Sequence, residues 1–323
     1  PSLEEASSAP FRDLCGASQE LYPSLVEGLQ EETGLDLQYR ASGLLVVAQT
    51  EGRAEELRAV CRGGLELGRR LEWVEGGLLR GLEPALSDTV PGAAYSPAAC
   101  HLNPGLLTQA LARAAASRGA VLRQGTAVVG FQSAGSRVSG VRTSDGERIA
   151  ADRVVLAAGP WTRRLARRLG VDIATRPIRG QILAYRSTAV HHILWGEGGY
   201  LVPKVGGFLF AGATVEDVGF RPRTTRRGEA TLRRTAAAMV PALRRAEVAS
   251  AWAGLRPGSP NGQPMIGGLP GRENVFIATG HFRNGVLLAP ITGKIMARLM
   301  LEGVEGSLEP FGGLDWRKWR GSL

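Results

Sequence analysis

Two arginines in glycine-rich surroundings are the residues of this 323-residue chain best suited to chemistry. Arg256 lies in AGLRPG (residues 253–258) and Arg283 in GHFRNG (residues 280–285). A guanidinium offers a rigid fork of donors that matches a carboxylate, and neighbouring glycines leave room for a ligand because they carry no Cβ. Arg256 is therefore a candidate for binding a carboxylate. The competing interpretation is a surface arginine paired with an acid.

The elements around Arg283 suit a flat, electron-accepting ring. An apolar strand is predicted over 275–278, the glycine-hinged loop follows, and an apolar helical pattern then runs to about Leu301. The start of that helix presents unpaired N–H groups and the positive end of the helix dipole. This pattern alone is common, and the two arginines beside it make it more specific. The Arg283 side chain could equally face solvent.

Two segments carry a resemblance to a known family. WAGLRPGSPNGQPMIG (residues 252–267) and ATGHFRNGVLLAPITG (residues 278–293) resemble the C-terminal flavin region of the D-amino-acid-oxidase superfamily. The nearest match is the glycine oxidases of thiamine biosynthesis, and the resemblance extends over nearly the whole chain. It implies an FAD-dependent enzyme that oxidises glycine, or a similar small amino acid such as sarcosine or D-alanine, to the imine and 2-oxo acid. Electrons would reduce O2 to H2O2, and the imine would feed thiamine thiazole synthesis.

The resemblance also implies roles for single residues. Arg256 would clamp the substrate carboxylate, the Tyr200 hydroxyl would assist it, and the Arg283 carbonyl would receive the amino group. A half-buried strand tyrosine is the alternative for Tyr200. The implied cofactor-binding residues are Val128, whose backbone would face the adenine end of FAD, and Ala158, Gly159, Trp161, Gly280, His281, Phe282, Arg283, Asn284, Gly285 and Val286. Hydride transfer to a flavin needs alignment more than a protein base, which fits the lack of a Ser-His-Asp or paired-carboxylate signature.

The implied fold class is α/β, with a Rossmann-like FAD-binding domain interleaved with an antiparallel-sheet substrate domain. The FAD-binding domain would comprise residues 1–36, 95–176 and 251–323, and the substrate domain residues 37–94 and 177–250. Family members begin with a strand–GxGxxG–helix unit, and no such motif occurs here between a strand and a helix. We expect the FAD-binding domain to lack its first βαβ unit. The 323 residues alone should then bind FAD weakly and aggregate.

Local patterns predict the elements that position these residues. Asn103 is a helix N-cap candidate before Pro104, and residues 153–157 form a continuous apolar run typical of a buried parallel strand. Helices are predicted over 11–33, 51–71, 104–118, 161–170, 228–239 and 286–301. Strands are predicted over 43–48, 93–96, 120–123, 126–132, 137–143, 148–150, 153–157, 178–185, 199–203, 208–213 and 275–278.

Composition narrows the function classes. Hydrophobic residues make up 44% and charged residues 21%, and no run of about 18 uncharged apolar residues exists, so a membrane span is not expected. The net charge of +9 comes from scattered arginine pairs that predict a solvated surface rather than nucleic-acid binding. Three cysteines without CxxC and four histidines without ligand spacing predict no metal site and a reducing, cytoplasmic location. The expected partners are the amino acid and O2, and formation of a homo-oligomer is left open.

The sequence departs from the glycine oxidase pattern at two positions, and two alternative functions stay open. Gly198 and Val215 stand where some glycine oxidases carry larger side chains, so we expect substrates larger than glycine to be accepted. No cysteine follows Cys100, which excludes the covalent flavin attachment of sarcosine oxidases in this region. The alternatives are another oxidase or dehydrogenase of the superfamily, or a flavin-free, non-catalytic fragment; the colour of the purified protein separates enzyme from fragment.

Overall fold

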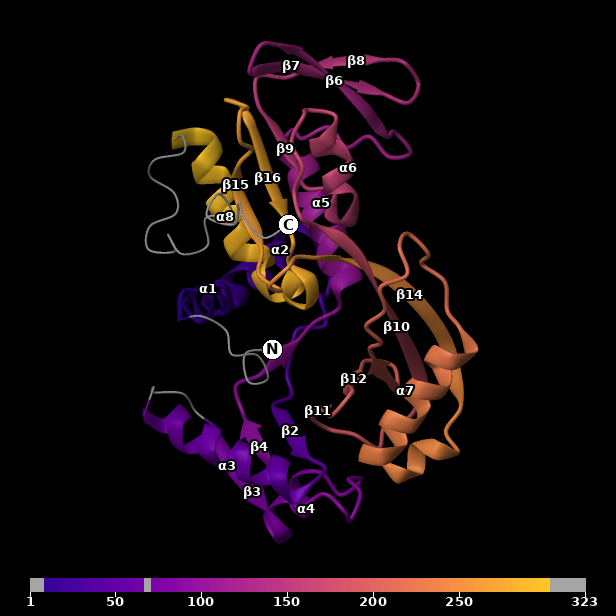
Figure 1. Ribbon diagram of the computed structural model, residues 1–323. Coiled ribbons are helices and arrows are strands. Elements are labelled where there is room, and N and C mark those ends of the chain that lie inside the picture. Colours follow the sequence, from indigo (N-terminus) through magenta and orange to yellow (C-terminus); the bar gives the residue numbers. More distant parts are fainter. Residues whose placement is uncertain (1–8, 67–70, 303–323) are drawn as a thin grey trace.

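The computed structural model describes residues 9–66 and 71–302 (Figure 1). Its elements follow the order α1 (Ala9–Glu20), α2 (Tyr22–Thr33), β1 (Arg40–Ala41), β2 (Leu44–Ala48), α3 (Glu51–Glu66), β3 (Glu72–Glu75), α4 (Gly76–Leu82), β4 (Gly92–Ser96), β5 (Cys100–His101), α5 (Pro104–Ser117), β6 (Val128–Ala134), β7 (Arg137–Thr143), β8 (Arg148–Ala150), β9 (Val154–Leu156), η1 (Gly159–Trp161), α6 (Thr162–Arg167), β10 (Arg176–Arg186), β11 (Ile193–Gly196), β12 (Gly199–Lys204), β13 (Phe208–Gly212), α7 (Arg226–Met239), η2 (Pro241–Arg244), β14 (Val248–Gly258), β15 (Met265–Gly268), β16 (Val275–Thr279), η3 (Phe282–Asn284) and α8 (Gly285–Glu302).

The largest sheet has eight strands in the order β14-β10-β13-β12-β11-β2-β4-β3. It joins two distant parts of the chain, because β2, β3 and β4 precede α5 whereas the other five strands follow α6. The contact between these parts is the parallel pair β11–β2, in which Leu194 lies opposite Leu45. Strand β14 runs without a break across residue 251, the expected domain boundary, and pairs with β10 along its length.

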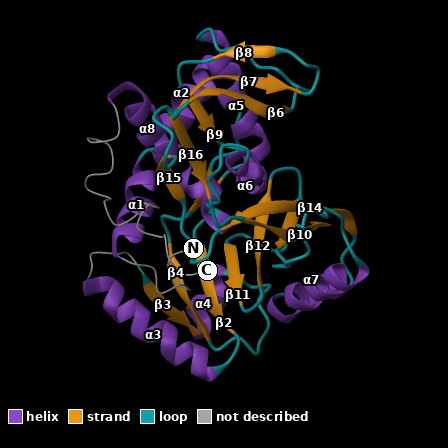
Figure 2. Ribbon diagram, turned by 45° about the horizontal axis from the view of Figure 1, so that its top comes forward, coloured by secondary structure: helices purple, strands orange, loops and turns teal. Residues whose placement is uncertain are grey.

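Alternate side chains of the large sheet face a helical layer on one side. Leu183, Leu201 and Leu209 pack there with Leu232 and Met239 of α7. Figure 2 shows α7 beside this part of the sheet. Burial of these side chains fixes the register of β10, β12 and β13, since a shift by one residue would place the leucines on the opposite face.

A smaller sheet has the order β15-β16-β9, and β16 runs parallel to β9 with Val275 opposite Val154. The parallel strand predicted over 153–157 is therefore confirmed. Helices α1 and α8 lie side by side against this sheet (Figure 1). Phe11 and Leu14 of α1 form a core with Leu288 and Ile295 of α8. This packing places the start of α8 at one end of β16.

Two predicted elements are wrong. The single helix over 11–33 is two helices that break at Leu21, because Pro23 in the first turn of α2 has no N–H to continue the helical hydrogen bonds. The strand over 120–123 is not formed, and Val121 is 84% exposed. Apolar residues suit a strand only where a neighbouring strand pairs with them, and none does so here among the described residues. Helix α3 ends at Glu66, and positions 67–70 of the longer helix predicted there lie outside the described residues.

The predicted start of α5 is confirmed in atomic detail. The Asn103 side chain accepts hydrogen bonds from the backbone N–H groups of Gly105 (3.0 Å) and Leu106 (3.3 Å), and Pro104 occupies the first turn. The cap satisfies N–H groups that have no partner inside the helix. It also fixes the path of the chain from His101 to Gly105, which borders the cavity described next.

Candidate active site

A cavity of about 500 Å³ lies against the face of the large sheet that α7 does not cover. Its lining residues come from the stretch between β5 and the first turn of α5, from strands β10 to β14, and from η3: His101, Asn103, Pro104, Gly105, Ile182, Ile193, Trp195, Tyr200, Val202, Lys204, Phe210, Trp252, Arg256, Arg283 and Asn284. The three residues predicted to act on the substrate, Arg256, Tyr200 and Arg283, are thus brought together. The alternation along β12 explains the position of Tyr200, because Leu201 beside it is fully buried on the opposite face.

Arg256 and Tyr200 form a polar pair at one end of this cavity. Arg256 Nη1 donates to the Thr214 carbonyl at 3.1 Å, and the guanidinium also hydrogen-bonds with Tyr200. Burial lowers the pKa of Arg256 and raises that of Tyr200, so the pair stays a cation beside a neutral phenol near neutral pH. In the described part of the chain no carboxylate pairs with Arg256. Its charge is therefore available to an anionic ligand.

Two glycines that the sequence reasoning missed form the floor under this pair. A Cβ added at Gly180 would lie 2.1 Å from Arg256 Nη1, and one added at Gly212 would lie 2.5 Å from the Tyr200 hydroxyl. Only glycine leaves room for the two side chains to lie flat on strands β10 and β13. The sequence signal was available: the strand patterns place a glycine within 178–185 and another within 208–213, but the cross-strand partners that lie over them are not visible locally.

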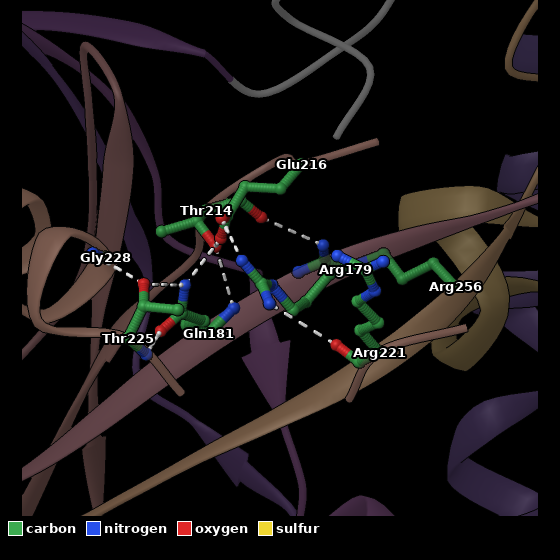
Figure 3. Close-up of polar contacts among 8 residues, drawn as sticks. All are labelled: Arg179, Gln181, Thr214, Glu216, Arg221, Thr225, Gly228 and Arg256. Carbon is green, nitrogen blue, oxygen red and sulfur yellow. Dashed lines mark hydrogen bonds and ion pairs between the residues drawn. The ribbon is translucent and has the colours of Figure 1, made fainter. Parts of the chain in front are cut away.

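A partly buried polar network holds the carbonyl that orients Arg256 (Figure 3). Glu216 accepts hydrogen bonds from Arg179 (2.5 Å), Gln181 (2.6 Å) and the Thr214 hydroxyl (2.5 Å). Gln181 also bonds Thr225, which caps α7. These contacts connect β10, the segment after β13 and the start of α7. They fix Thr214 and therefore the position of the guanidinium.

We expect Glu216→Gln to reduce the stability of the folded protein near neutral pH and to make that stability less sensitive to a fall in pH. Burial is the largest influence and raises the pKa of Glu216, but the hydrogen bonds from Arg179, Thr214 and Gln181 outweigh it and lower the pKa from 4.5 to about 2. A depressed folded-state pKa contributes stability above the unfolded value, and that contribution is lost as pH falls from about 4.5 to about 2. The measurement is the urea midpoint across this window. The exposed Glu247→Gln is the control, and equal pH profiles for wild type and Glu216→Gln would contradict the expectation.

The loop before α8 has the tight geometry that its glycines predict. Gly280 has φ 77° and packs against Met265, where a Cβ would lie 3.1 Å from that side chain. Phe282 also has a positive φ, 46°, and Arg283 lies over the Trp195 ring at 5.0 Å from its centroid. The Asn284 side chain is buried and its Oδ1 has no hydrogen-bond partner among the described residues. This orphaned acceptor at the cavity suits a ligand that brings an N–H group.

The other predicted cofactor residues lie outside this cavity. The loop from Ala158 to Trp161 is tied to β16 by the Thr279 hydroxyl, which donates to the Gly159 carbonyl at 3.0 Å. His281 is half-buried, and its Nε2 lies 3.0 Å from the Thr292 hydroxyl. Three of the predicted residues are large apolar side chains exposed to solvent: Val128 (36%), Trp161 (46%) and Val286 (44%). These features fit FAD, because its ring and adenine would cover apolar surface and its pyrimidine edge offers a donor to Asn284.

The structure places several residues differently from what the sequence indicated. Gly198 and Val215, the basis for expecting a wider pocket, do not line the cavity, and Val215 is 56% exposed. His101, one of the four histidines without ligand spacing, lines the cavity beside Lys204. Sequence reasoning also missed the aromatic lining by Trp195, Phe210 and Trp252.

None of the helices in residues 9–66 and 71–302 is long and apolar enough to cross a membrane. Within the same ranges no group of three or more His, Cys, Asp or Glu side chains is placed to hold a metal ion.

Comparisons with known proteins show the family of this chain. Residues 2–299 match the family model for FAD-dependent oxidoreductases (DAO). A glycine oxidase from Geobacillus kaustophilus is 35% identical over 301 residues, which cover 92% of this chain and 79% of that protein. A bifunctional ThiO/ThiG protein from Synechocystis sp. is 33% identical over 311 residues, 94% of this chain and 44% of that protein. The crystal structure of the G. kaustophilus glycine oxidase has a TM-score of 0.89 at 35% identity and covers 95% of this chain and 84% of its own. The predicted fold class is confirmed.

Proposed function

The chain belongs to the DAO family of FAD-dependent oxidoreductases and is an FAD-dependent amino-acid oxidase, and we propose that it oxidises glycine or a similarly small amino acid such as sarcosine or D-alanine. The observation that carries this proposal is the Arg256–Tyr200 pair, which has no carboxylate partner among the described residues and lies in a cavity bordered by the loop before α8. A guanidinium with a phenol beside it matches a substrate carboxylate.

The residues of the chain bind and orient the amino acid. Arg256 and the Tyr200 hydroxyl donate hydrogen bonds to the carboxylate, and the Arg283 carbonyl accepts one from the amino group. FAD, when bound, would supply the electron acceptor for oxidation at Cα. The aromatic walls at Trp195 and Trp252 exclude water, and the orientation of Cα is the main contribution of the protein.

The roles of the other predicted residues follow from the same arrangement. We assign cofactor binding to the loops 158–161 and 280–286 and to Val128, which lie at or next to ends of β6, β9 and β16. The division into an FAD-binding domain (residues 1–36, 95–176 and 251–323) and a substrate domain (37–94 and 177–250) is part of this proposal. The three cysteines are free thiols in the described chain, which supports a reducing, cytoplasmic location.

The electron acceptor and the pathway are also proposed. Names of relatives support them: proteins similar to this chain are called glycine oxidase and ThiO/ThiG. We assign O2 as the acceptor, with H2O2 as product, and thiamine thiazole synthesis as the use of the imine. Another oxidase or dehydrogenase of the family is the second candidate, because the same carboxylate clamp would serve any amino acid.

A substrate panel tests this function. Protein carrying bound FAD is expected to form peroxide with glycine, sarcosine and D-alanine, and to lose its visible flavin absorbance when each is added without oxygen. Bleaching without peroxide would move the assignment to a dehydrogenase. Flavin that stays oxidised with every amino acid in the panel would contradict the proposed function.

A further inference from the structure

The end of the cavity away from Arg256 carries another cation, Lys204. Its Cα lies four residues along β12 from that of Tyr200, roughly 13 Å away at about 3.3 Å per residue, and both side chains are on the same face of the sheet. Lys204 Nζ donates to the Leu102 carbonyl at 2.9 Å and lies 3.2 Å from His101 Nδ1. The ammonium is thus held at a defined position on the cavity wall.

No negative charge balances this ammonium. The residues that line the cavity include neither Asp nor Glu, and in the described part of the chain no carboxylate pairs with Lys204. Burial, helped by the charges of Lys204 and Arg40, lowers the pKa of His101 to about 4, so His101 is a neutral acceptor near neutral pH. Burial lowers the pKa of Lys204 to about 8, which leaves it mainly protonated there. Lys204 Nζ also lies 5.7 Å from the centroid of the Phe210 ring. These neutral contacts leave the charge without a counter-ion in the described part of the chain, and a carboxylate ligand would supply one.

An apolar band separates the two ends of the cavity. Val202 lies between Tyr200 and Lys204 on β12, and Phe210 is its partner on β13. Phe210 packs edge-on against Trp252 with ring centroids 5.0 Å apart. This band suits a short hydrocarbon chain, whereas the ends suit carboxylates.

We propose that Lys204, with His101 and the Leu102 carbonyl behind it, forms a second anion subsite for amino acids that carry a side-chain carboxylate, such as D-aspartate and D-glutamate. The inference rests on the proposed function, because Arg256 must hold the α-carboxylate while Lys204 holds the other. The alternative is that Lys204 only ties β12 to the segment before α5.

Matched substrates test this subsite on the FAD-bound protein. D-aspartate and D-asparagine have nearly the same shape and differ in charge, so the wild type should favour D-aspartate by roughly 10- to 100-fold in kcat/KM. Lys204→Met should abolish this preference and leave kcat/KM for D-alanine within about threefold. Lys204→Arg should retain part of it. Lys294→Met, which removes an exposed lysine of α8, is the control and should change neither ratio.

Binding without turnover separates this inference from the proposed function. Titration calorimetry with succinate and its monoamide, succinamate, reads the second charge without any oxidation. Tighter binding of succinate, lost in Lys204→Met, supports the subsite even if no amino acid is oxidised. Equal binding of the two ligands to the wild type would overturn it, as would a Lys204→Met variant that loses D-aspartate and D-alanine activity alike.

Discussion

Replacing Arg256 by alanine is expected to lower kcat/KM for glycine by roughly 10- to 100-fold while FAD stays bound. The charge-assisted hydrogen bonds from the guanidinium to the carboxylate are worth about 1.5–3 kcal/mol, and their loss appears directly in kcat/KM. Arg256→Lys should recover only part of the loss, because an ammonium keeps the charge but not the two-donor fork. Steady-state peroxide formation is the measurement.

The control for Arg256 is a cation on the same sheet that lies outside the cavity. Arg186 of β10 has a side chain 60% exposed and pairs with Glu247 at 3.7 Å. Arg186→Ala should leave kcat/KM within about twofold, since surface ion pairs contribute little. If Arg256→Ala behaves like Arg186→Ala, the carboxylate has another partner and the assignment of Arg256 is wrong.

Gly180→Ala is expected to reduce activity nearly as much as removal of Arg256. The added Cβ would lie 2.1 Å from Arg256 Nη1 and 2.4 Å from Cζ and Nη2, so the guanidinium must leave its place. Misplacing a binding group by ~1 Å can cost about 100-fold in rate, and we expect a loss of roughly 10- to 100-fold in kcat/KM. Stability should change little, because the displaced group is the end of a flexible side chain and the φ of Gly180 is not in the left-handed region.

The sheet offers a matched glycine for comparison. Gly254 lies directly opposite Gly180 on β14, and a Cβ there would meet nothing within 4 Å. Gly254→Ala should therefore leave kcat/KM and the melting temperature close to those of the wild type. Equal losses in the two variants would show that a methyl group is harmful at either position. Gly180 would then have no specific role in making room for the Arg256 guanidinium.

Local signals predict the parts of the fold that depend on neighbours in sequence. Asn103 and Pro104 define the start of α5 because a cap needs only three successive residues. The apolar run at 153–157 identifies β9 because both of its faces are covered. The strand expected over 120–123 is not formed, because a strand needs a pairing partner from elsewhere in the chain. The break at Leu21 has a local cause, Pro23 in the first turn of α2, which the apolar pattern over 11–33 does not reveal.

The candidate site, too, was predicted where its signal is local in sequence and missed where distant residues come together. Arg256 and Arg283 stand out from their glycine-rich surroundings, and the resemblance supplied Tyr200. The subsite at Lys204 was missed because His101 and Lys204 are 103 positions apart and meet only where β12 passes the segment before α5. The network around Glu216 likewise joins residues of β10, the segment after β13 and α7, which share no pattern in sequence.

Anaerobic mixing of glycine with FAD-bound protein tests the central claim most directly. Stopped-flow absorbance follows reduction of the flavin in a single turnover and separates substrate binding from the hydride-transfer step. The wild type should bleach with a rate that saturates in glycine. Arg256→Ala should need roughly 10- to 100-fold more glycine to reach half of its limiting rate. Flavin that glycine does not reduce, or a half-saturating concentration unchanged in Arg256→Ala, would contradict the account.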